Sequence, residues 1–254
     1  MKQKNLVRIQ KVMSQMGISS RRQSEKMMVE GRIILNSKIV TELGTKMDPE
    51  TDHLKVDGKP VRIKENRIYM VLNKPKGYLT TSFDDRSRPT IYDLINKKIK
   101  MWLFTVGRLD YNSEGLLLLT NDGQMSRYLT LPQNNIERIY EAKLQGVIKK
   151  EELKKINDGI MLEDGWISKP KVRFSKKTKE NCWVEVILKS GKNREVRRIF
   201  ERVGYNILKL RRISFGPIKL GDIKPGELRH LTPLEINKLN LLCSNKTVEI
   251  RNRK

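Results

Sequence analysis

The sequence contains little cysteine or histidine. Its 254 residues include two cysteines and two histidines. Cys182 and Cys243 are too far apart in the chain for a disulfide framework or a zinc-ligand pair, so we expect two free thiols in a reducing cytoplasm. His53 and His230 have no partners at metal-binding spacing. We therefore predict a cytoplasmic protein without a bound metal.

Sequence signals of membranes and nucleotides are also missing. No apolar run reaches the length of a membrane-spanning helix, and residues 1–13 alternate apolar and charged side chains instead of forming the uninterrupted stretch of a secretory signal. There is no dinucleotide-binding fingerprint, and residues 190–193, Ser-Gly-Lys-Asn, do not form a phosphate-binding Walker motif. These absences leave a cofactor-free enzyme or a binding protein, with no membrane partner and no nucleotide cofactor.

The chain carries a large excess of positive charge. It has 53 Lys and Arg residues against 29 Asp and Glu residues, which gives a formal net charge of +24. Such a field favours a polyanionic partner. A lysine-rich composition can also reflect a biased genome, so the motifs must decide between the two explanations.

The N-terminal residues show two helical patterns. Apolar residues recur at three- and four-residue spacing over residues 6–16, and Gly17 then predicts the end of a short helix. Ser20 and Gln23 have the spacing of a capping box and predict a second helix, which Gly31 ends. The apolar positions of the first pattern are Leu6, Ile9, Val12, Met13 and Met16.

Two strand-like stretches follow these helices. Residues 32–40 and 53–61 are rich in β-branched and apolar residues and are interrupted by turn residues. Asp57-Gly58 is the stronger hairpin signal of the two. The N-terminal region is therefore predicted to contain two helices and a small sheet.

Four basic residues cluster around the predicted helix junction: Lys11, Arg21, Arg22 and Arg32. Arg21 and Arg22 lie in a first helical turn, where positive side chains oppose the helix dipole, and a phosphate partner would offset that cost. Residues 8–40 as a whole resemble the S-four-like RNA-binding domain, which implies that these four side chains contact RNA. The alternative is an ordinary solvated face.

Residues 59–67 combine proline, charge and little apolar content, which places a domain boundary there. We predict an S-four-like domain at 1–62, a larger domain at 67–242 and a basic C-terminal tail at 243–254. Within that tail, residues 245–254 are expected to have no regular structure.

The larger domain alternates short apolar strand-like runs with helix-like stretches. This pattern predicts an α+β domain built on a mixed, mostly antiparallel sheet. Within residues 104–123 a strand is expected to deliver Asp110 into a polar loop before a second strand returns to the core. Taken alone, an Asp in that position is usually a turn residue that bonds its own backbone.

Three motifs change this interpretation of Asp110. Residues 104–123, with Gly-Arg-Leu-Asp at 107–110, resemble the catalytic motif of pseudouridine synthases. Residues 73–77 resemble the opening motif of that family, and residues 191–198 its late motif. The C-terminal part, from Val203 onward, is similar to the RsuA branch, which modifies ribosomal RNA. The resemblance implies an RNA-modifying isomerase, an intramolecular transferase that converts uridine to pseudouridine without a cofactor.

The resemblance also implies roles for three residues. Asp110 matches the family nucleophile, which acts where the bond between ribose and uracil breaks. Tyr140 matches the tyrosine that stacks beneath the base and can act as a general base, although a sheet-core aromatic is the alternative. Arg197 matches the cation that keeps the buried carboxylate ionised. Direct attack by Asp110 and a route through a glycal intermediate both stay open.

Further basic residues are predicted to hold the RNA. A uridine in folded RNA must be flipped out of its stack at a cost of roughly a few kcal/mol. Arg108 could fill the vacated space or clamp a phosphate, and three basic residues of the late motif, on or beside one predicted helix, are expected to grip phosphates. The predicted contacts in this domain are Lys74, Arg108, Lys192, Arg194 and Arg198.

The substrate is predicted from a small difference in the late motif. Arg194-Glu195 stand where the small-subunit branch of the family tends to have a histidine-glutamine pair, which favours large-subunit (23S) ribosomal RNA. The expected partner is ribosomal RNA or a ribosomal precursor particle, bound by a monomer. The alternatives are the same reaction on small-subunit RNA and a non-catalytic RNA-binding or ribosome-assembly protein.

Overall fold

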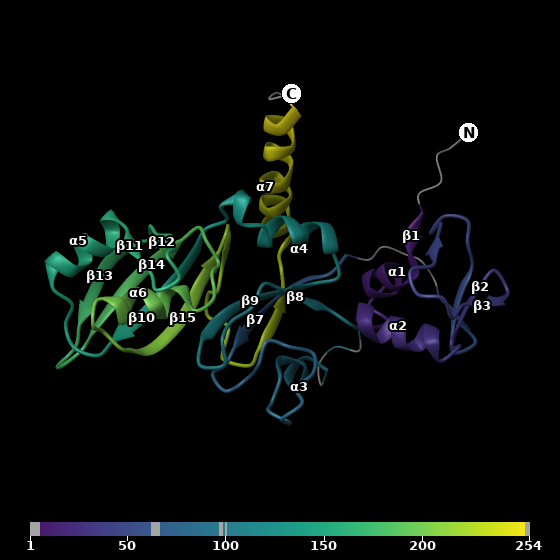
Figure 1. The fold of residues 1–254 in the computed structure, drawn as a ribbon, viewed down its shortest axis with the longest axis horizontal. Helices are drawn as coiled ribbons and strands as arrows, with labels where there is room; N and C mark the ends of the chain where they lie inside the picture. The colour runs from purple at the N-terminus through teal and green to yellow at the C-terminus, as the bar shows by residue number, and fades with distance from the viewer. Residues whose placement is uncertain (1–5, 62–66, 97–98, 100, 252–254) are drawn as a thin grey trace. The chain divides into compact units, whose positions relative to one another are not determined.

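The computed structural model describes residues 6–61, 67–96, 99 and 101–251, with side chains described as far as Ser244. The described chain forms two compact units (Figure 1). The first unit contains Met1–Tyr69, Asn96–Phe104 and Leu119–Gly123, and the second contains the remaining segments.

The two predicted N-terminal helices are present in the first unit. Helix α1 spans Ile9–Gln15 and is followed by Gly17 at φ +69°, and helix α2 spans Arg21–Val29. The Ser20 side chain accepts a hydrogen bond from the Gln23 backbone N–H at 3.1 Å, as the capping pattern predicts. One residue of the apolar pattern departs from it. Leu6 precedes α1 and is 52% exposed, so it does not join the buried face.

A small sheet completes this module. Strands β2 (Ile33–Leu35), β3 (Lys38–Ile39), β5 (Leu54–Val56) and β6 (Lys59–Pro60) pair in the order β3-β2-β5-β6. Asp57 and Gly58 both have positive φ and form the predicted hairpin turn. A second, two-stranded sheet pairs β1 (Val7–Arg8) with β4 (Lys46–Met47).

Two later segments belong to this first unit as well. The Trp102 backbone N–H donates to the Gly17 carbonyl at 2.7 Å, and the Asn121 side chain donates to the Gln15 carbonyl at 2.9 Å. The predicted domain ranges 1–62 and 67–242 each consist of one continuous segment, whereas this compact unit is built from three segments of the chain. The predicted domain boundaries therefore stay a proposal. Residues 62–66, where the boundary was placed, lie outside the described residues.

A nine-stranded sheet forms the framework of the larger domain (Figure 1). The strand order is β13-β14-β10-β15-β9-β7-β17, with β16 paired to β15 and β8 to β9. Strand β9 runs parallel to β15, whereas β10, β14 and β13 pair antiparallel, so the predicted mixed α+β sheet is confirmed. The strands are β7 (Tyr69–Lys74), β8 (Phe104–Val106), β9 (Glu114–Thr120), β10 (Arg138–Leu144), β13 (Lys171–Lys177), β14 (Cys182–Leu188), β15 (Ile207–Phe215), β16 (Ile218–Lys219) and β17 (Leu228–His230).

Helices α5 and α6 cover one face of this sheet at strands β10, β14 and β15. Ile156 of α5 and Phe200 of α6 are fully buried against alternating apolar residues such as Ala142 and Val184. This cover ends where polar side chains replace apolar ones on the same face, and the cleft described below begins there. The helical and short strand elements are α3 (Ile91–Ile95), α4 (Gly123–Thr130), the 3-10 turn η1 (Pro132–Asn134), α5 (Lys150–Asp158), β11 (Ile160–Met161), β12 (Ile167–Ser168), α6 (Glu195–Arg202) and α7 (Pro233–Arg251).

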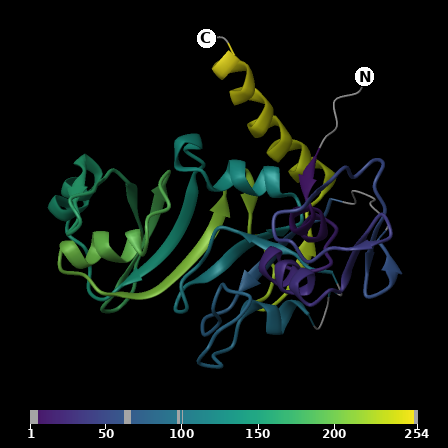
Figure 2. The same ribbon diagram turned by 45° about the vertical axis from the view of Figure 1, so that its right-hand side comes forward.

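The prediction of an irregular C-terminal tail is wrong for residues 245–251, and residues 252–254 lie outside the described residues. Helix α7 runs unbroken from Pro233 to Arg251, and Figure 2 shows it as a single helix. Its start is fixed by a reciprocal cap, in which Glu235 accepts from the Thr232 N–H at 2.9 Å and Thr232 accepts from the Glu235 N–H at 3.2 Å. No glycine or proline follows to end it before residue 252. No helix in the described part of the chain is both long and apolar enough to cross a membrane.

Candidate active site

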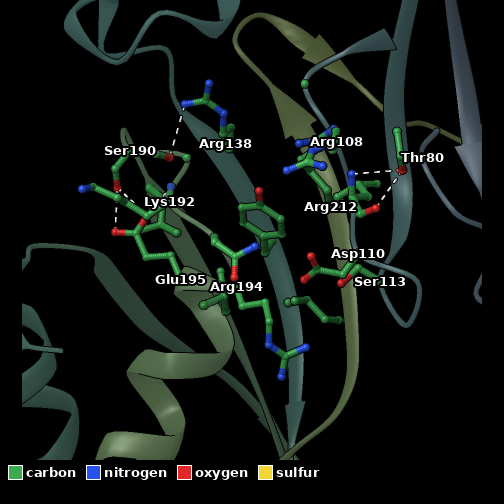
Figure 3. A pocket seen from close by; sticks show the side chains of 18 of the residues that line it. Thr80, Arg108, Asp110, Ser113, Arg138, Ser190, Lys192, Arg194, Glu195 and Arg212 are labelled. Atoms are coloured by element: carbon green, nitrogen blue, oxygen red, sulfur yellow. Dashed lines mark hydrogen bonds between the residues drawn. The ribbon is translucent and has the colours of Figure 1, made fainter. Parts of the chain in front are cut away.

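A cleft of about 640 Å³ opens in the second unit. Figure 3 shows Thr80, Arg108, Asp110 and Arg212 on one side of the view, and Ser190, Lys192 and Glu195 on the other. The first side consists of the loop after β8 and part of β15. The second side consists of the loop that precedes α6. Tyr140 on β10 also lines the cleft.

The Asp110 loop is held from both ends. Gly107, just after β8, has φ +74°, a conformation that favours glycine and turns the chain out of the sheet. The Thr80 hydroxyl donates to the Leu109 carbonyl at 2.7 Å, and the Ser113 backbone N–H donates to the Asp110 carbonyl at 3.0 Å. Asp110 is therefore half-buried on a fixed loop and lines the cleft.

Lys74 is not an RNA-binding residue, which corrects the sequence-based prediction. It ends strand β7 with 0% exposure, and its ammonium donates to the carbonyls of Pro75, Asp110 and Ser113 at 3.1, 3.1 and 2.9 Å. Burial lowers the pKa of Lys74 to about 8, while the charges of Asp110 and Glu114 act in the opposite direction. Lys74 thus supports the Asp110 loop from inside the protein.

Arg197 lies on α6 and interacts with the same loop. It donates to the Asn112 carbonyl at 3.2 Å and to the Ile207 carbonyl at 3.4 Å. Burial is the main cause that lowers the pKa of Arg197, and the charge of Asp110 raises it. The structure therefore places the predicted cation as a support of the loop that carries Asp110, through its bond to the Asn112 carbonyl.

Tyr140 lines the cleft, as expected for a residue beneath a base. Its ring is half-buried and also packs against the core under α5 and α6. The two interpretations of this tyrosine are therefore compatible, because one side of the ring can pack while the other faces the cleft.

Glu195 organises the opposite side of the cleft, a role that the sequence did not reveal. It is 3% exposed and accepts hydrogen bonds at 2.7 Å from the Ser168 and Ser190 hydroxyls. It also accepts from the Lys192 backbone N–H at 3.2 Å. The loop before α6 is therefore fixed, and its basic side chains are presented from a defined backbone.

The predicted RNA-binding side chains of this unit fall into two groups. Arg108, Lys192 and Arg194 are exposed and line the cleft. Lys192 lies 4.4 Å from the centre of the Trp166 ring, and Arg194 also pairs with Glu201 at 3.6 Å. Arg198 is different, because its side chain is 12% exposed and is held by Glu163 and Asp164. The four side chains therefore do not share one binding face.

In the first unit, Lys11, Arg21 and Arg22 are exposed, as the RNA-binding prediction requires. Arg32 is also exposed, but its guanidinium donates to Asp57 at 2.7 Å and to Glu30 at 3.0 Å. These bonds raise the pKa of Arg32. Arg32 therefore has partners in the protein itself that the sequence pattern did not indicate.

Two buried arginines of the cleft were not predicted. Arg138 and Arg212 are 6% and 2% exposed, and both guanidinium groups lie against the Phe215 ring, at 4.9 and 5.1 Å. Both arginines lie in strands where apolar residues alternate with polar ones. Their position in that alternation was the only sequence signal that could have indicated that they are buried. Among the described residues no cluster of His, Cys, Asp or Glu could hold a metal ion, and both cysteines are free.

A carboxylate on a held loop, a tyrosine and three exposed cations line one cleft, an arrangement expected of an enzyme that works on a polyanion. The comparisons with known proteins specify which one. Residues 68–202 match the RNA pseudouridylate synthase family, and residues 7–53 match the S4 domain. The chain belongs to the RNA pseudouridine synthase family and is an isomerase with an S4 domain at residues 7–53.

Close relatives agree over almost the whole chain. An uncharacterised RNA pseudouridine synthase of Aquifex aeolicus is 41% identical over 92% of this chain and 93% of its own length. Ribosomal large subunit pseudouridine synthase B of Bacillus subtilis is 37% identical over 94% of this chain and 97% of its own. A solved pseudouridylate synthase, 28% identical, superposes with a TM-score of 0.63 over 92% of this chain and 99% of its own.

Proposed function

We propose that this enzyme isomerises one specific uridine of large-subunit ribosomal RNA in the cytoplasm, as a monomer and without a cofactor. The similarity to the Bacillus subtilis large-subunit enzyme supports the choice of RNA. The observation that carries the catalytic assignment is the position of Asp110 on a loop that Lys74, Thr80 and Arg197 all hold at the cleft.

In this proposal Asp110 is the nucleophile or charge partner at the ribose carbon of the flipped uridine. Tyr140 lies beneath the base and can accept a ribose proton. Lys74 and Arg197 hold the loop that carries Asp110, through hydrogen bonds to the carbonyls of Asp110 and Asn112. The exposed side chains of Arg108, Lys192 and Arg194 contact the RNA backbone around the flipped nucleotide.

The S4 domain supplies a second contact with the same RNA molecule or precursor particle. Its candidate residues are Lys11, Arg21 and Arg22, with a smaller share from Arg32 because of its bonds to Asp57 and Glu30. Linking two weak RNA-binding surfaces in one chain raises the overall affinity through effective concentration.

The test is a map of pseudouridines in ribosomal RNA from cells with and without the gene. We expect one large-subunit site to disappear, to return with the wild-type gene and to stay absent with Asp110→Asn. In a purified reaction the Asp110→Asn rate should fall by at least about 10³-fold while the RNA dissociation constant changes little. A missing small-subunit site would redirect the substrate assignment, and full activity of Asp110→Asn would refute the catalytic one.

A further inference from the structure

Arg212 is a buried cation with an unused hydrogen-bond donor. Its Nε donates to the Leu116 carbonyl at 2.8 Å, which fixes the plane of the guanidinium. Its Nη2 is buried and has no hydrogen-bond partner. Buried polar groups in folded proteins are nearly always paired, so such a group at a candidate active site points to a ligand that is absent from the resting enzyme.

The strand register places Arg212 beside Tyr140 in the lining of the cleft. Arg212 pairs with Tyr140 across β10 and β15, and with Gly115 across β15 and β9. Gly115 has φ +104°, and a Cβ there would overlap the Arg212 backbone, so glycine permits this close approach of the two strands. Arg212 is thereby held between the tyrosine expected beneath the base and the strand that follows the Asp110 loop.

The second buried arginine of the cleft, Arg138, differs from Arg212 because both of its terminal nitrogens donate hydrogen bonds. Arg138 donates to the carbonyls of Ile136, Lys189 and Ser190 through Nη1, and to that of Leu129 through Nη2. The charge of Arg212 and, above all, burial lower the pKa of Arg138. Two buried positive charges therefore lie at the Phe215 ring in the lining of the cleft, and Arg212 has the unpaired donor.

A positive site of this kind is poorly matched to neutral uridine and well matched to an anion formed during the reaction. When the bond between ribose C1′ and uracil N1 breaks, the electron pair stays with the base. The detached uracil then carries a negative charge shared by N1, O2 and O4. Fixed donors directed at such developing charge stabilise a transition state strongly in a site that excludes water.

We propose that Arg212 stabilises the detached uracil anion, an inference that rests on the proposed catalytic cleft around Asp110. As the C1′–N1 bond breaks, C1′ bonds to Asp110 or the ribose loses its C2′ proton. After the base turns, C5 bonds to C1′. On the first route the bond between C1′ and Asp110 breaks in that step and releases the carboxylate, and on the second route the C2′ proton is returned. The C5 proton then leaves and N1 takes up a proton. The product is an isomer of the substrate, so no further reactant is needed. A phosphate is the less suitable ligand, because Arg212 is 2% exposed whereas the exposed cations line the rim.

The experiment compares two substrates on one protein. A hairpin RNA carrying the mapped uridine is prepared with uridine or with 5-fluorouridine, whose base holds negative charge more readily. Loss of the starting nucleoside is followed in a single turnover by chromatography of nuclease digests. We expect Arg212→Gln to slow loss of uridine by about 10²-fold and loss of 5-fluorouridine by clearly less, about 10-fold. Equal slowing of both substrates would overturn the proposal.

Two further variants separate charge from folding. Arg212→Lys keeps a cation and should recover part of the uridine rate. Arg211→Gln removes the neighbouring arginine, whose side chain points to the opposite face of the same strand, and should leave both rates unchanged. The ratio of the two substrates is measured on the same sample, so partial misfolding of a variant cancels.

Binding and a nucleophile control complete the design. If Arg212→Gln weakens RNA binding and its salt dependence while the single-turnover rate at saturation is unchanged, Arg212 binds a phosphate and the proposal fails. If Asp110→Asn cleaves normally in the same assay, the proposed function fails instead. An inactive Asp110→Asn together with equal slowing by Arg212→Gln would reject only the role of Arg212.

Discussion

Both units of the chain carry exposed cations, but the second unit also buries positive charge beside its cleft. In the S4 domain Lys11, Arg21 and Arg22 are exposed on and beside short helices. In the second unit Lys74 and Arg212 are 0% and 2% exposed and bind backbone carbonyls. Both kinds of residue count equally toward the net charge of +24. Only the exposed cations can bind RNA phosphates directly.

The comparison shows what composition can and cannot establish. A strongly basic chain predicts a polyanionic partner correctly in class, but it cannot say which cation touches that partner. A buried lysine such as Lys74 acts on geometry, because it joins the end of β7 to two carbonyls of the Asp110 loop. Variants of buried and exposed cations should therefore differ in what they change, and by how much.

The largest effect on stability is expected for Lys74→Met. The substitution keeps a similar volume but removes the ammonium that donates to the carbonyls of Pro75, Asp110 and Ser113, so the free energy of unfolding should fall by about 3 kcal/mol. The pseudouridylation rate should fall as well, since the Asp110 loop loses its inner support. Urea denaturation and a single-turnover assay measure the two losses. Lys76→Met, at an exposed lysine, is the matched control. Equal losses of unfolding free energy and of rate in the two variants would show that Lys74 does not support the Asp110 loop.

The charge of Lys74 predicts a pH dependence of stability. Its pKa in the folded protein, about 8, lies below its ordinary value of 10.5, so between these values the unfolded state binds more protons. Unfolding free energy should therefore rise with pH over this interval, as the cost of the buried charge is removed. The measurement is the difference between wild type and Lys74→Met at pH 7.5 to 10.5, chosen to span that window. A flat difference would mean that Lys74 keeps its proton throughout.

The smallest effect is expected for the exposed pair in the S4 domain. Arg21→Ala with Arg22→Ala should weaken RNA binding and reduce the slope of log affinity against log salt by up to about one phosphate contact per residue. Stability should barely change, because both side chains are exposed. Arg32→Ala is the control, since its guanidinium is already bonded to Asp57 and Glu30. Equal losses of the salt-dependence slope in the double variant and in Arg32→Ala would show that the bonded Arg32 contacts RNA as much as Arg21 and Arg22 do.

Local patterns account for what the sequence predicted. The Asp57-Gly58 turn, the Ser20 cap and the strand, loop and strand around Asp110 each depend on a few consecutive residues. The sequence motifs alone are sufficient to indicate the family to which the chain belongs. The site residues Asp110, Tyr140 and Arg108 all line the one cleft of the second unit described above.

Long-range contacts account for what the sequence did not predict. Lys74 is buried because carbonyls 36 and 39 residues further along the chain lie over it. The place of Arg212 depends on its pairing with Gly115, and the role of Glu195 depends on Ser168. The error in the C-terminal tail has a different origin. Its polar composition suggested disorder, whereas the cap at Thr232 and the lack of a helix-breaking residue favour a continuous helix.

The hydrogen bonds from Trp102 and Asn121 to the carbonyls of Gly17 and Gln15 have a consequence for dissecting this enzyme. A chain shortened to begin at β7 would remove both acceptors along with the S4 domain. Such a truncation therefore changes the interior of what remains, and a loss of activity in it would not measure RNA binding alone. Point substitutions at Arg21 and Arg22 avoid this ambiguity. If the S4 domain were lost or exchanged during evolution, the Trp102 backbone N–H and the Asn121 side chain would each need a new hydrogen-bond acceptor.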